Sequence, residues 1–229
     1  MIKILSWNIR QGGGSRISKI IAYIQKSEAQ IVTLNEYRNN KSGEKIRGQL
    51  LSLGYRHQLV SQSTQNDNSV FIASKIPFNG KLFPKSDTKY GGNIVCASFE
   101  AFDLYGVYLP HKKKHQLFDF FLNHLPSQKA SIIAGDFNSG INGLDQKGKS
   151  FWYEDELIAL NEIDYVDAFR LKNGQVQEYS WFSHQGNGYR YDHTYIHTDL
   201  SPICSACYFD HQVRQNGLSD HSAMFLELG

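Results

Sequence analysis

Asp136 and Asn138, two residues whose side chains can bind a metal ion or hold a water molecule, come directly after a short apolar run at residues 130–134. We expect this run to form a buried strand. Because side chains alternate along an extended chain, positions 136 and 138 lie on the same side of it. A carboxylate and an amide would then emerge together at the carboxyl edge of a sheet, where α/β sheets usually bind ligands. A polar turn after a core strand would look the same, so this pair alone does not establish a site.

The same pattern recurs along the chain, because other apolar segments also border a residue of metal-ligand type. These residues are Asn8 after 2–7, Glu36 after 31–34, Asp192 within 189–197, and the pair Asp220 and His221 before 223–228. Any one of them could be a solvated strand end. Their recurrence, always with Asn, Asp, Glu or His, favours one shared site.

The chemistry that these residue types favour is metal-dependent cleavage of a phosphoester. Carboxylate and amide oxygens suit Mg²⁺ or Mn²⁺ better than Zn²⁺. Such a cation neutralises a phosphate oxygen and stabilises charge on the leaving oxygen. The reaction also needs a group that contacts the phosphate or moves a proton. A histidine beside a carboxylate can do this, because the carboxylate fixes the tautomer of the imidazole. We expect His221 and Asp192 to form that pair.

Length and composition bound the class of protein. The 229 residues are 41% hydrophobic, which is enough for a large core, and we expect one domain over 1–229. The net charge of +2 does not by itself indicate a nucleic-acid-binding protein, although a local basic face is compatible with it. The first seven residues are too short for a signal peptide, and no apolar run could span a bilayer. We therefore expect a cytoplasmic protein without a membrane contact.

Two smaller patterns have ordinary structural explanations. Cys204 and Cys207 form a single C-x-x-C, and with three cysteines in the chain we favour buried thiols over a zinc or redox site. The basic segment at 111–115 is expected to be a solvated loop, with the alternative that it contacts a nucleic-acid backbone.

Strands and helices alternate in the predicted order of elements. We expect strands at 2–7, 31–34, 69–73, 94–99, 102–108, 130–134, 189–197, 203–209 and 223–228, and helices near 17–24, 46–53, 117–125 and 153–160. Since several strands pair as neighbours, the order predicts mixed sheets covered by helices, a layered α/β sandwich.

An ordered set of short motifs resembles the endonuclease/exonuclease/phosphatase superfamily. The matching positions are 6–10, 34–36, 69–74, 108–110, 135–138, 190–192 and 219–221. Positions 108–110, 166–170 and 180–182 are most similar to the exonuclease III branch, which contains abasic-site DNA repair enzymes. The resemblance implies a four-layered α/β sandwich of two mixed β-sheets flanked by helices.

The resemblance also implies a role for each acidic position near the metal. Glu36 would be the principal ligand of Mg²⁺ or Mn²⁺, with Asn8 and Asp220 close to the ion. Asp136 would orient or deprotonate the attacking water. Asn138 would hold that water or the phosphate.

The remaining implied roles concern the phosphate group. Tyr108 would hydrogen-bond the scissile phosphate, and Asp192 would orient His221 against it. Arg10 stands where repair enzymes often have an acidic or small residue, and it resembles deoxyribonuclease I in this respect. Arg10 would then contact phosphate, with a solvated arginine as the alternative. His111 is a further candidate for contact with the substrate backbone, because it comes shortly after Tyr108.

Aromatic residues near Asp192 match the positions that, in the repair enzymes, form an apolar pocket for a flipped-out sugar without a base. These positions are Trp181, Tyr189 and Tyr191, and Arg190 lies between the two tyrosines. We expect Trp181, Tyr189 and Arg190 to bind substrate. Aromatic residues beside a strand can instead be core, and Tyr189 could stack on a single-stranded base.

Three functional hypotheses follow. The first is a Mg²⁺-dependent DNA nuclease of the exonuclease III type, monomeric, which incises abasic sites and processes 3′ ends. The second is the same chemistry on RNA, a tyrosyl-DNA adduct or another phosphoester, which the reduced loops after Gly54 and Asp136 leave open. The third is an inactive nucleic-acid-binding module, which would need a broken set of site residues.

Overall fold

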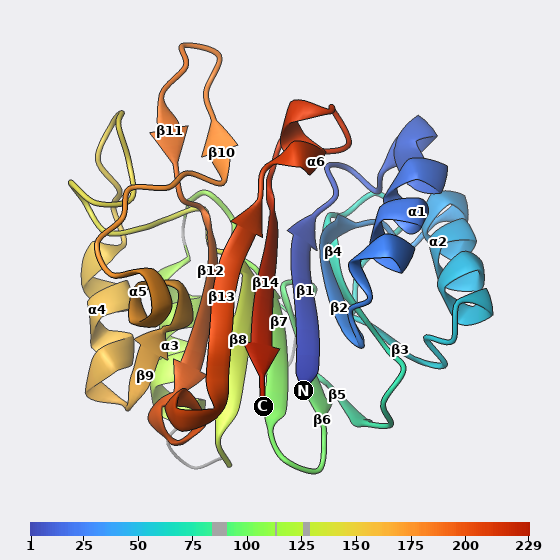
Figure 1. Ribbon diagram of the computed structural model, residues 1–229, viewed down its shortest axis with the longest axis horizontal. Helices are drawn as coiled ribbons and strands as arrows, with labels where there is room; N and C mark the ends of the chain where they lie inside the picture. Colours follow the sequence, from blue (N-terminus) through green and yellow to red (C-terminus); the bar gives the residue numbers. More distant parts are fainter. Residues whose placement is uncertain (84–90, 113, 126–128) are drawn as a thin grey trace.

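Two mixed β-sheets stacked face to face, with helices on both outer faces, make up the structure (Figure 1). It is a computed structural model that describes residues 1–83, 91–112, 114–125 and 129–229. The arrangement is the four-layered α/β sandwich predicted from the sequence. Among the described residues, no helix is both long and apolar enough to cross a membrane.

The first sheet has six strands in the order β13-β14-β1-β2-β4-β3. Its strands are β1 (Ile2–Asn8), β2 (Ile31–Tyr37), β3 (His57–Val60), β4 (Ser69–Ser74), β13 (Cys204–Asp210) and β14 (Ala223–Leu228). β1 and β2 are parallel, and the other neighbours are antiparallel.

The second sheet also has six strands, in the order β5-β6-β7-β8-β12-β9. Its strands are β5 (Asn79–Leu82), β6 (Ile94–Ser98), β7 (Asp103–Tyr108), β8 (Ser131–Asp136), β9 (Tyr165–Asp167) and β12 (Asp192–His197). β7 and β8 are the parallel pair. A separate small hairpin of β10 (Trp181–Phe182) and β11 (Gly188–Tyr189) projects above the sheets in Figure 1.

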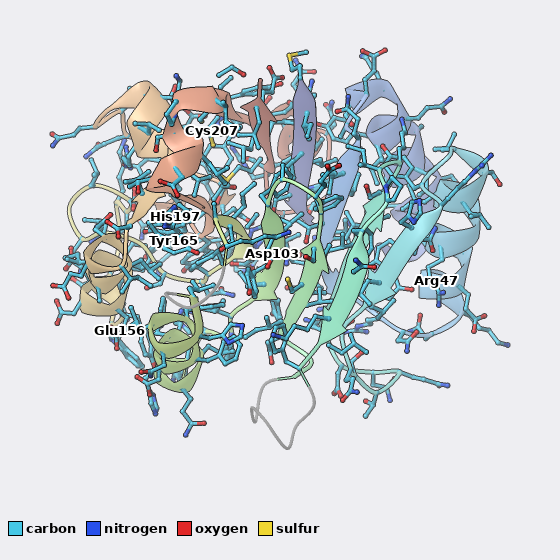
Figure 2. All side chains as sticks on the ribbon, turned by 90° about the horizontal axis from the view of Figure 1, so that it is seen from below. Arg47, Asp103, Glu156, Tyr165, His197 and Cys207 are labelled. Carbon is cyan, nitrogen blue, oxygen red and sulfur yellow. The ribbon has the colours of Figure 1, made fainter. Side chains whose placement is uncertain are left out.

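Helices complete the two outer layers. They are α1 (Ile17–Ser27) and α2 (Lys41–Ser52) on the first sheet, α3 (His115–His124) and α4 (Glu154–Glu162) on the second, the shorter α5 (Ala168–Asn173) and α6 (Gln212–Gln215), and the 3₁₀ turns η1 (Gly14–Arg16) and η3 (Thr198–Ile203). Figure 2, seen from below, shows Arg47 of α2 and Glu156 of α4 on opposite flanks of the molecule.

Apolar side chains fill all three spaces between the layers. Ile20 and Ile24 of α1 are fully buried against the first sheet, as the helical spacing of the isoleucines predicts. Ile72 and Ile132 meet between the two sheets, and Phe118 of α3 packs on the outer face of the second. Each side chain of this size contributes about 1.5–3 kcal/mol when fully buried.

Most predicted elements are confirmed, with small shifts at their ends. The predicted strand at 189–197 is wrong at its start, because Arg190 and Tyr191 interrupt it. The backbone of Tyr191 instead accepts a hydrogen bond from Phe137 N at 2.8 Å. Cys204 and Cys207 are buried free thiols, as expected.

The carboxyl ends of the parallel strands bring the polar residues to one edge. Asn8 is opposite Asn35 in the register of β1 and β2. Asp136 is opposite Tyr108 on one side and Asp192 on the other. Residues from five distant parts of the sequence therefore meet at the upper edge of Figure 1.

Candidate active site

Asn8 connects two carboxylates that come from different sheets. Its Nδ2 donates to Asp136 Oδ2 at 2.9 Å and to Glu36 Oε1 at 3.2 Å. Its amide oxygen accepts from Arg10 N at 2.9 Å. Asn8 is fully buried, so its position ties the ends of the two sheets together. It presents N–H groups to the two carboxylates, whereas an oxygen would be needed to bind an ion between them.

Glu36 sits at an irregular point of β2, where the pairing with β4 shifts between Asn35 and Tyr37. Its backbone φ is +53°, a left-handed conformation that is uncommon for a residue with a Cβ atom. Gln11 N donates to Glu36 Oε2 at 2.8 Å, and Gly12 N donates to Glu36 O at the same distance. The glycine-rich turn at 11–14 therefore holds this carboxylate in place.

Asp136 and Asn138 do emerge together at the end of β8. Asp136 Oδ1 accepts the backbone N–H of Asn138 at 2.9 Å, and Asn138 Nδ2 donates to Leu109 O at 3.0 Å. Asn138 has a φ of +48°. A Cβ atom at Gly135 would lie 1.9 Å from Val107 O, so only glycine fits immediately before Asp136.

His221 forms the predicted pair with Asp192. Its Nδ1 lies 2.8 Å from Asp192 Oδ2, and its Nε2 lies 3.9 Å from Asp136 Oδ2. Trp7 Nε1 donates to His221 O at 3.1 Å and fixes the backbone. With Nδ1–H donated to Asp192, the other ring nitrogen faces Asp136 and the space where a substrate phosphate would bind.

The two buried groups have shifted pKa values. Burial raises the pKa of Asp136 to about 7, and Asp192 adds to this while His221 opposes it. Burial alone would lower the pKa of His221, but the carboxylates of Asp192 and Asp136 raise it to about 10. His221 is therefore an imidazolium at neutral pH, able to contact an anionic phosphate.

An oxygen-rich acidic cluster fits a hard divalent cation. Asn8 bonds to both Glu36 and Asp136, and burial, with Asp192 adding to it, raises the pKa of Asp136, so a nearby cation would favour its charged form. Ligand atoms of Asp136, Asp192 and His221 also lie within 4.8 Å of one another. A protonated His221 bonded to Asp192 cannot ligate, so the oxygen donors around Glu36 are the better metal site.

Addition of Mg²⁺ is expected to raise the Tm of the protein in a manner that depends on pH. Saturation at 100 times Kd would contribute about 2.7 kcal/mol. Below pH 7 a proton on Asp136 weakens the attraction, so the shift in Tm should be larger at pH 8 than at pH 6. Thermal unfolding in EDTA and in Mg²⁺ at both pH values measures it. Glu36→Gln should abolish the shift, and an equal shift in that variant would contradict the site.

Tyr108 lies at the end of β7, half-buried beside the acidic cluster. Its hydroxyl is 3.4 Å from Glu36 Oε1 and 3.5 Å from Asn68 Nδ2. Burial, Glu36 and Asp136 all raise its pKa, so it stays a neutral donor. Asn68 was not predicted, because it lies in a polar stretch before β4 and nothing local distinguishes it from an ordinary turn residue.

Arg10 and Asp220 lie at the outer rim of the site. Arg10 Nε is 3.9 Å from Asp220 Oδ2, and their side chains are 59% and 41% exposed. A pair this exposed contributes little to stability. Ser219 Oγ donates to Asn8 O at 2.6 Å, which brings the 219–221 segment against the end of β1. Both rim side chains can therefore reach a ligand from solvent.

A cavity of about 280 Å³ adjoins Asn138. It is lined by His111, Asn138, Lys149, Ser150, Phe151, Trp152, Tyr153, Trp181, Ser183, Tyr189 and Tyr191. The rings of Tyr189 and Tyr191 stack at 5.3 Å, and Tyr191 lies 6.4 Å from the ring of His221. Three predicted substrate residues, Trp181, Tyr189 and His111, thus share one cavity. The part contributed by 149–153 was not predicted.

The prediction that Arg190 contacts substrate is wrong. Its side chain is fully buried, and it points away from the cavity to pair with Asp145 at 2.8 Å and Asp167 at 2.6 Å. Because neighbouring side chains of an extended segment point to opposite sides, the tyrosines on either side face the cavity while Arg190 faces the interior.

The prediction of a solvated basic loop at 111–115 is also wrong for Lys114, which is fully buried. Its Nζ donates to the backbone oxygens of Phe137 and Asn138. Lys112 lies near the ring of Trp152, and His115 begins α3. Residue 113 lies outside the described residues.

The chain is similar to known proteins in both sequence and fold. Residues 5–221 match the Endonuclease/Exonuclease/phosphatase family. A DNA-(apurinic or apyrimidinic site) endonuclease of Dictyostelium discoideum is 24% identical over 213 residues, which cover 82% of this chain. The chain spans 58% of the length of that relative.

Three solved structures of similar fold cover this chain almost completely. The 3′ phosphatase NExo from Neisseria, bound to a product DNA hairpin, has a TM-score of 0.87 at 18% identity, with 100% of both chains covered. An AP endonuclease from Archaeoglobus fulgidus has a TM-score of 0.83 at 21% sequence identity, and the match covers 100% of this chain and 99% of that chain. The 3′-5′ exonuclease NExo from Neisseria meningitidis has a TM-score of 0.82 at 17% sequence identity, and the match covers 99% of both chains. At these identities the structures show the fold, and the match over 5–221 shows that the chain belongs to the Endonuclease/Exonuclease/phosphatase family.

Proposed function

We propose that the protein is a Mg²⁺- or Mn²⁺-dependent phosphodiesterase that acts on DNA, with abasic-site incision and 3′-end processing as its reactions. The observation that carries the proposal is the convergence of Asn8, Glu36, Asp136 and the Asp192–His221 pair at one sheet edge. The relatives named above act on DNA or abasic sites according to their names, which favours DNA over the other phosphoesters.

The chain's own residues divide the work of hydrolysis among them. Asp136 accepts a proton from the attacking water, which Asn138 helps to hold. His221, charged and oriented by Asp192, contacts the non-bridging oxygen of the phosphate, while Tyr108 donates a second hydrogen bond. These donors stabilise the charge that develops as water attacks phosphorus and the bond from phosphorus to the leaving oxygen breaks.

A cation held by Glu36, with Asp220 beside it, would neutralise a phosphate oxygen and stabilise the leaving oxygen. The oxygen donors fit Mg²⁺ and Mn²⁺ equally in kind. Asn8 keeps Glu36 and Asp136 at a fixed separation through its two hydrogen bonds. Asn8 then acts through these carboxylates, and its own oxygen stays with the backbone of Arg10.

The aromatic cavity beside Asn138 supports an abasic substrate. Trp181, Tyr189 and Tyr191 give it an apolar wall next to His221. A nucleotide without its base leaves the duplex at low cost, because little stacking is lost. The Tyr189 hydroxyl accepts the backbone N–H of Lys149 at 2.9 Å, so the wall is held rigidly.

Incision on the 5′ side of a tetrahydrofuran abasic analogue is expected to be faster than cleavage of the intact duplex. Matched end-labelled oligonucleotides with Mg²⁺ measure this: the abasic duplex, the intact duplex, a single strand and an RNA of the same sequence. Activity should disappear in EDTA. Because phosphate contacts depend on counterion release, binding should weaken steeply with salt.

Each other outcome points to a different function. Equal cutting of the intact and abasic duplexes would indicate a general nuclease, and preference for RNA would overturn the DNA proposal. Full activity in EDTA would contradict the metal-dependent chemistry. Trp181→Ala should reduce the preference for the abasic duplex. Trp152→Ala, at the exposed rim of the cavity, tests whether the outer part of the cavity contributes to this preference.

A further inference from the structure

Lys114 is a buried lysine whose side chain is committed to two backbone oxygens. Its side chain has no exposed surface, and Nζ donates to Phe137 O at 2.8 Å and to Asn138 O at 2.7 Å. Lysine is among the residues least often fully buried, because removal of its ammonium group from water is costly. The two hydrogen bonds offset part of this cost, and they end on the segment that follows Asp136.

The backbone of Lys114 is anchored independently of its side chain. Its carbonyl accepts from Leu117 N at 2.9 Å and Phe118 N at 3.3 Å at the start of α3. Its own N–H donates to the Tyr153 hydroxyl at 3.3 Å, and its Nζ lies 4.9 Å from the centre of that ring. Lys114 therefore connects the first turn of α3, the wall of the aromatic cavity and residues 137–138.

Residues 136–138 need such support because their conformation is unusual. Asn138 has a φ of +48°, a conformation that side chains with a Cβ atom rarely adopt. The same residue contributes the backbone N–H that bonds to Asp136 Oδ1 and the amide that bonds to Leu109 O. A rotation of the peptide between 137 and 138 would move the Asp136 carboxylate and the Asn138 amide together.

We propose that Lys114 is a positioning residue for hydrolysis, which holds the carbonyls of Phe137 and Asn138 so that Asp136 and Asn138 keep their reactive geometry. The expected effect on kcat rests on the proposed function, whereas the role of Lys114 in holding residues 136–138 does not. Lys114 does not line the aromatic cavity, so it acts through the segment it holds and does not contact substrate.

The protonation state of Lys114 does not alter this role. Burial lowers its pKa to about 7, although Asp136 and Glu156 oppose the shift. A neutral amine still carries two N–H donors, so both hydrogen bonds persist in either form.

Lys114→Met tests the role, because it keeps the apolar stem and removes the donors. We expect kcat to fall by about 10²-fold, the loss that follows a small misplacement of reacting groups, with KM little changed. Amide hydrogen exchange of the peptide containing 136–139 should become faster. Lys172→Met is the matched control, because Lys172 also donates to a backbone oxygen, Cys204 O at 3.0 Å, far from the site. It should change neither readout.

A second variant separates positioning from stability. Lys114→Ala should be restored in kcat and in exchange by propylammonium, which replaces the missing atoms, and not by tetramethylammonium, which has the charge without N–H donors. If Lys114→Met is unfolded, recovery of this alanine variant is the deciding measurement. The proposal would be overturned if propylammonium and tetramethylammonium restored kcat and exchange of Lys114→Ala equally well. Unchanged kcat and exchange in folded Lys114→Met would also overturn it. If the wild-type protein cuts no DNA, the proposed function fails while exchange still tests Lys114.

Discussion

Replacement of His221 with alanine is expected to lower kcat on an abasic duplex by about 10²–10⁴-fold, the range for a positioned acid, base or charge stabiliser. The reason is the loss of an imidazolium from a buried position beside Asp136, where its Nε2 lies 3.9 Å from Oδ2. In such a site a charge is worth far more than in water. KM should change less than kcat, because the contact strengthens as charge develops.

The same experiment tests whether Asp192 and His221 act as a unit. Asp192→Asn removes the carboxylate that accepts from His221 Nδ1 at 2.8 Å, so the ring loses both its orientation and the support for its charge. The double variant should lose little more than His221→Ala alone, because groups that act together are not additive. Additive losses in the double variant would contradict the pairing.

A control histidine, His197, lies at the opposite end of β12, the strand that begins with Asp192. His197 ends β12, and its ring centre lies 5.5 Å from that of Tyr165; Figure 2, the view from below, labels the two residues next to each other. His197→Ala should leave kcat unchanged and lower the free energy of unfolding only slightly. A loss of kcat equal to that of His221→Ala would show that the effect is not specific to the site.

Most of the side chains at the strand ends could be predicted from local rules. Parallel neighbours such as β1 and β2 end at the same edge, and Asp136 is the last residue of β8. Asn138 lies beside Asp136 for another reason than strand alternation, because its φ is +48° and its backbone N–H bonds to Asp136 Oδ1. The pairing of Asp192 with His221 followed from residue type and from the order of the motifs. None of these steps required knowledge of how the loops fold.

Arg190 could not be placed in this way, because its partners are distant in the sequence, one in a loop and one at the end of β9. Its carboxylate partners, Asp145 and Asp167, lie 45 and 23 residues away. In the sequence, Arg190 stands between two tyrosines and two residues before Asp192, and arginine and tyrosine are residue types that often contact substrate. Only the folded path of residues 139–145 shows that Arg190 turns inward.

Two other differences have similar causes. Lys114 belongs to a run of basic residues, and burial of one member depends on α3 packing against 137–138 rather than on any local pattern. The short strand β3 has only partly buried residues, so it carries no alternation of apolar and polar side chains that a sequence pattern could reveal.

Replacement of Arg190 with methionine is expected to destabilise the protein by about 3–5 kcal/mol, the cost of removing one partner from a buried ion pair. The guanidinium is fully buried and contacts Asp145 at 2.8 and 3.0 Å and Asp167 at 2.6 Å. Without it, both buried carboxylates lose the Arg190 guanidinium, although Asp145 still pairs with Arg170 and Asp167 still has His193 Nδ1 at 3.5 Å. Chemical denaturation measures the free energy of unfolding, and Arg47→Met, on the exposed face of α2, should change it by less than about 0.5 kcal/mol.

The size of this loss should depend on pH. Although burial by itself raises the pKa of Asp167, Arg190 and His193 hold that pKa well below its usual range. In the wild-type protein this contribution is present above the unfolded pKa of about 3.9 and is lost as the pH falls below it. In Arg190→Met the buried carboxyl takes up a proton more readily, so it destabilises the fold most above its raised pKa. The difference between the two proteins should therefore be larger at pH 8 than at pH 5.

A double-mutant cycle with Asp145→Asn identifies the interaction itself. Because Asp145→Asn removes one of the two carboxylates that pair with Arg190, Arg190→Met should cost less in that background than in the wild type. Equal costs in both backgrounds would mean that the loss comes from the pair with Asp167 or from packing on Phe169, whose ring lies 5.2 Å from the guanidinium. A smaller cost in the Asp145→Asn background would show that the ion pair between Arg190 and Asp145 accounts for part of the loss.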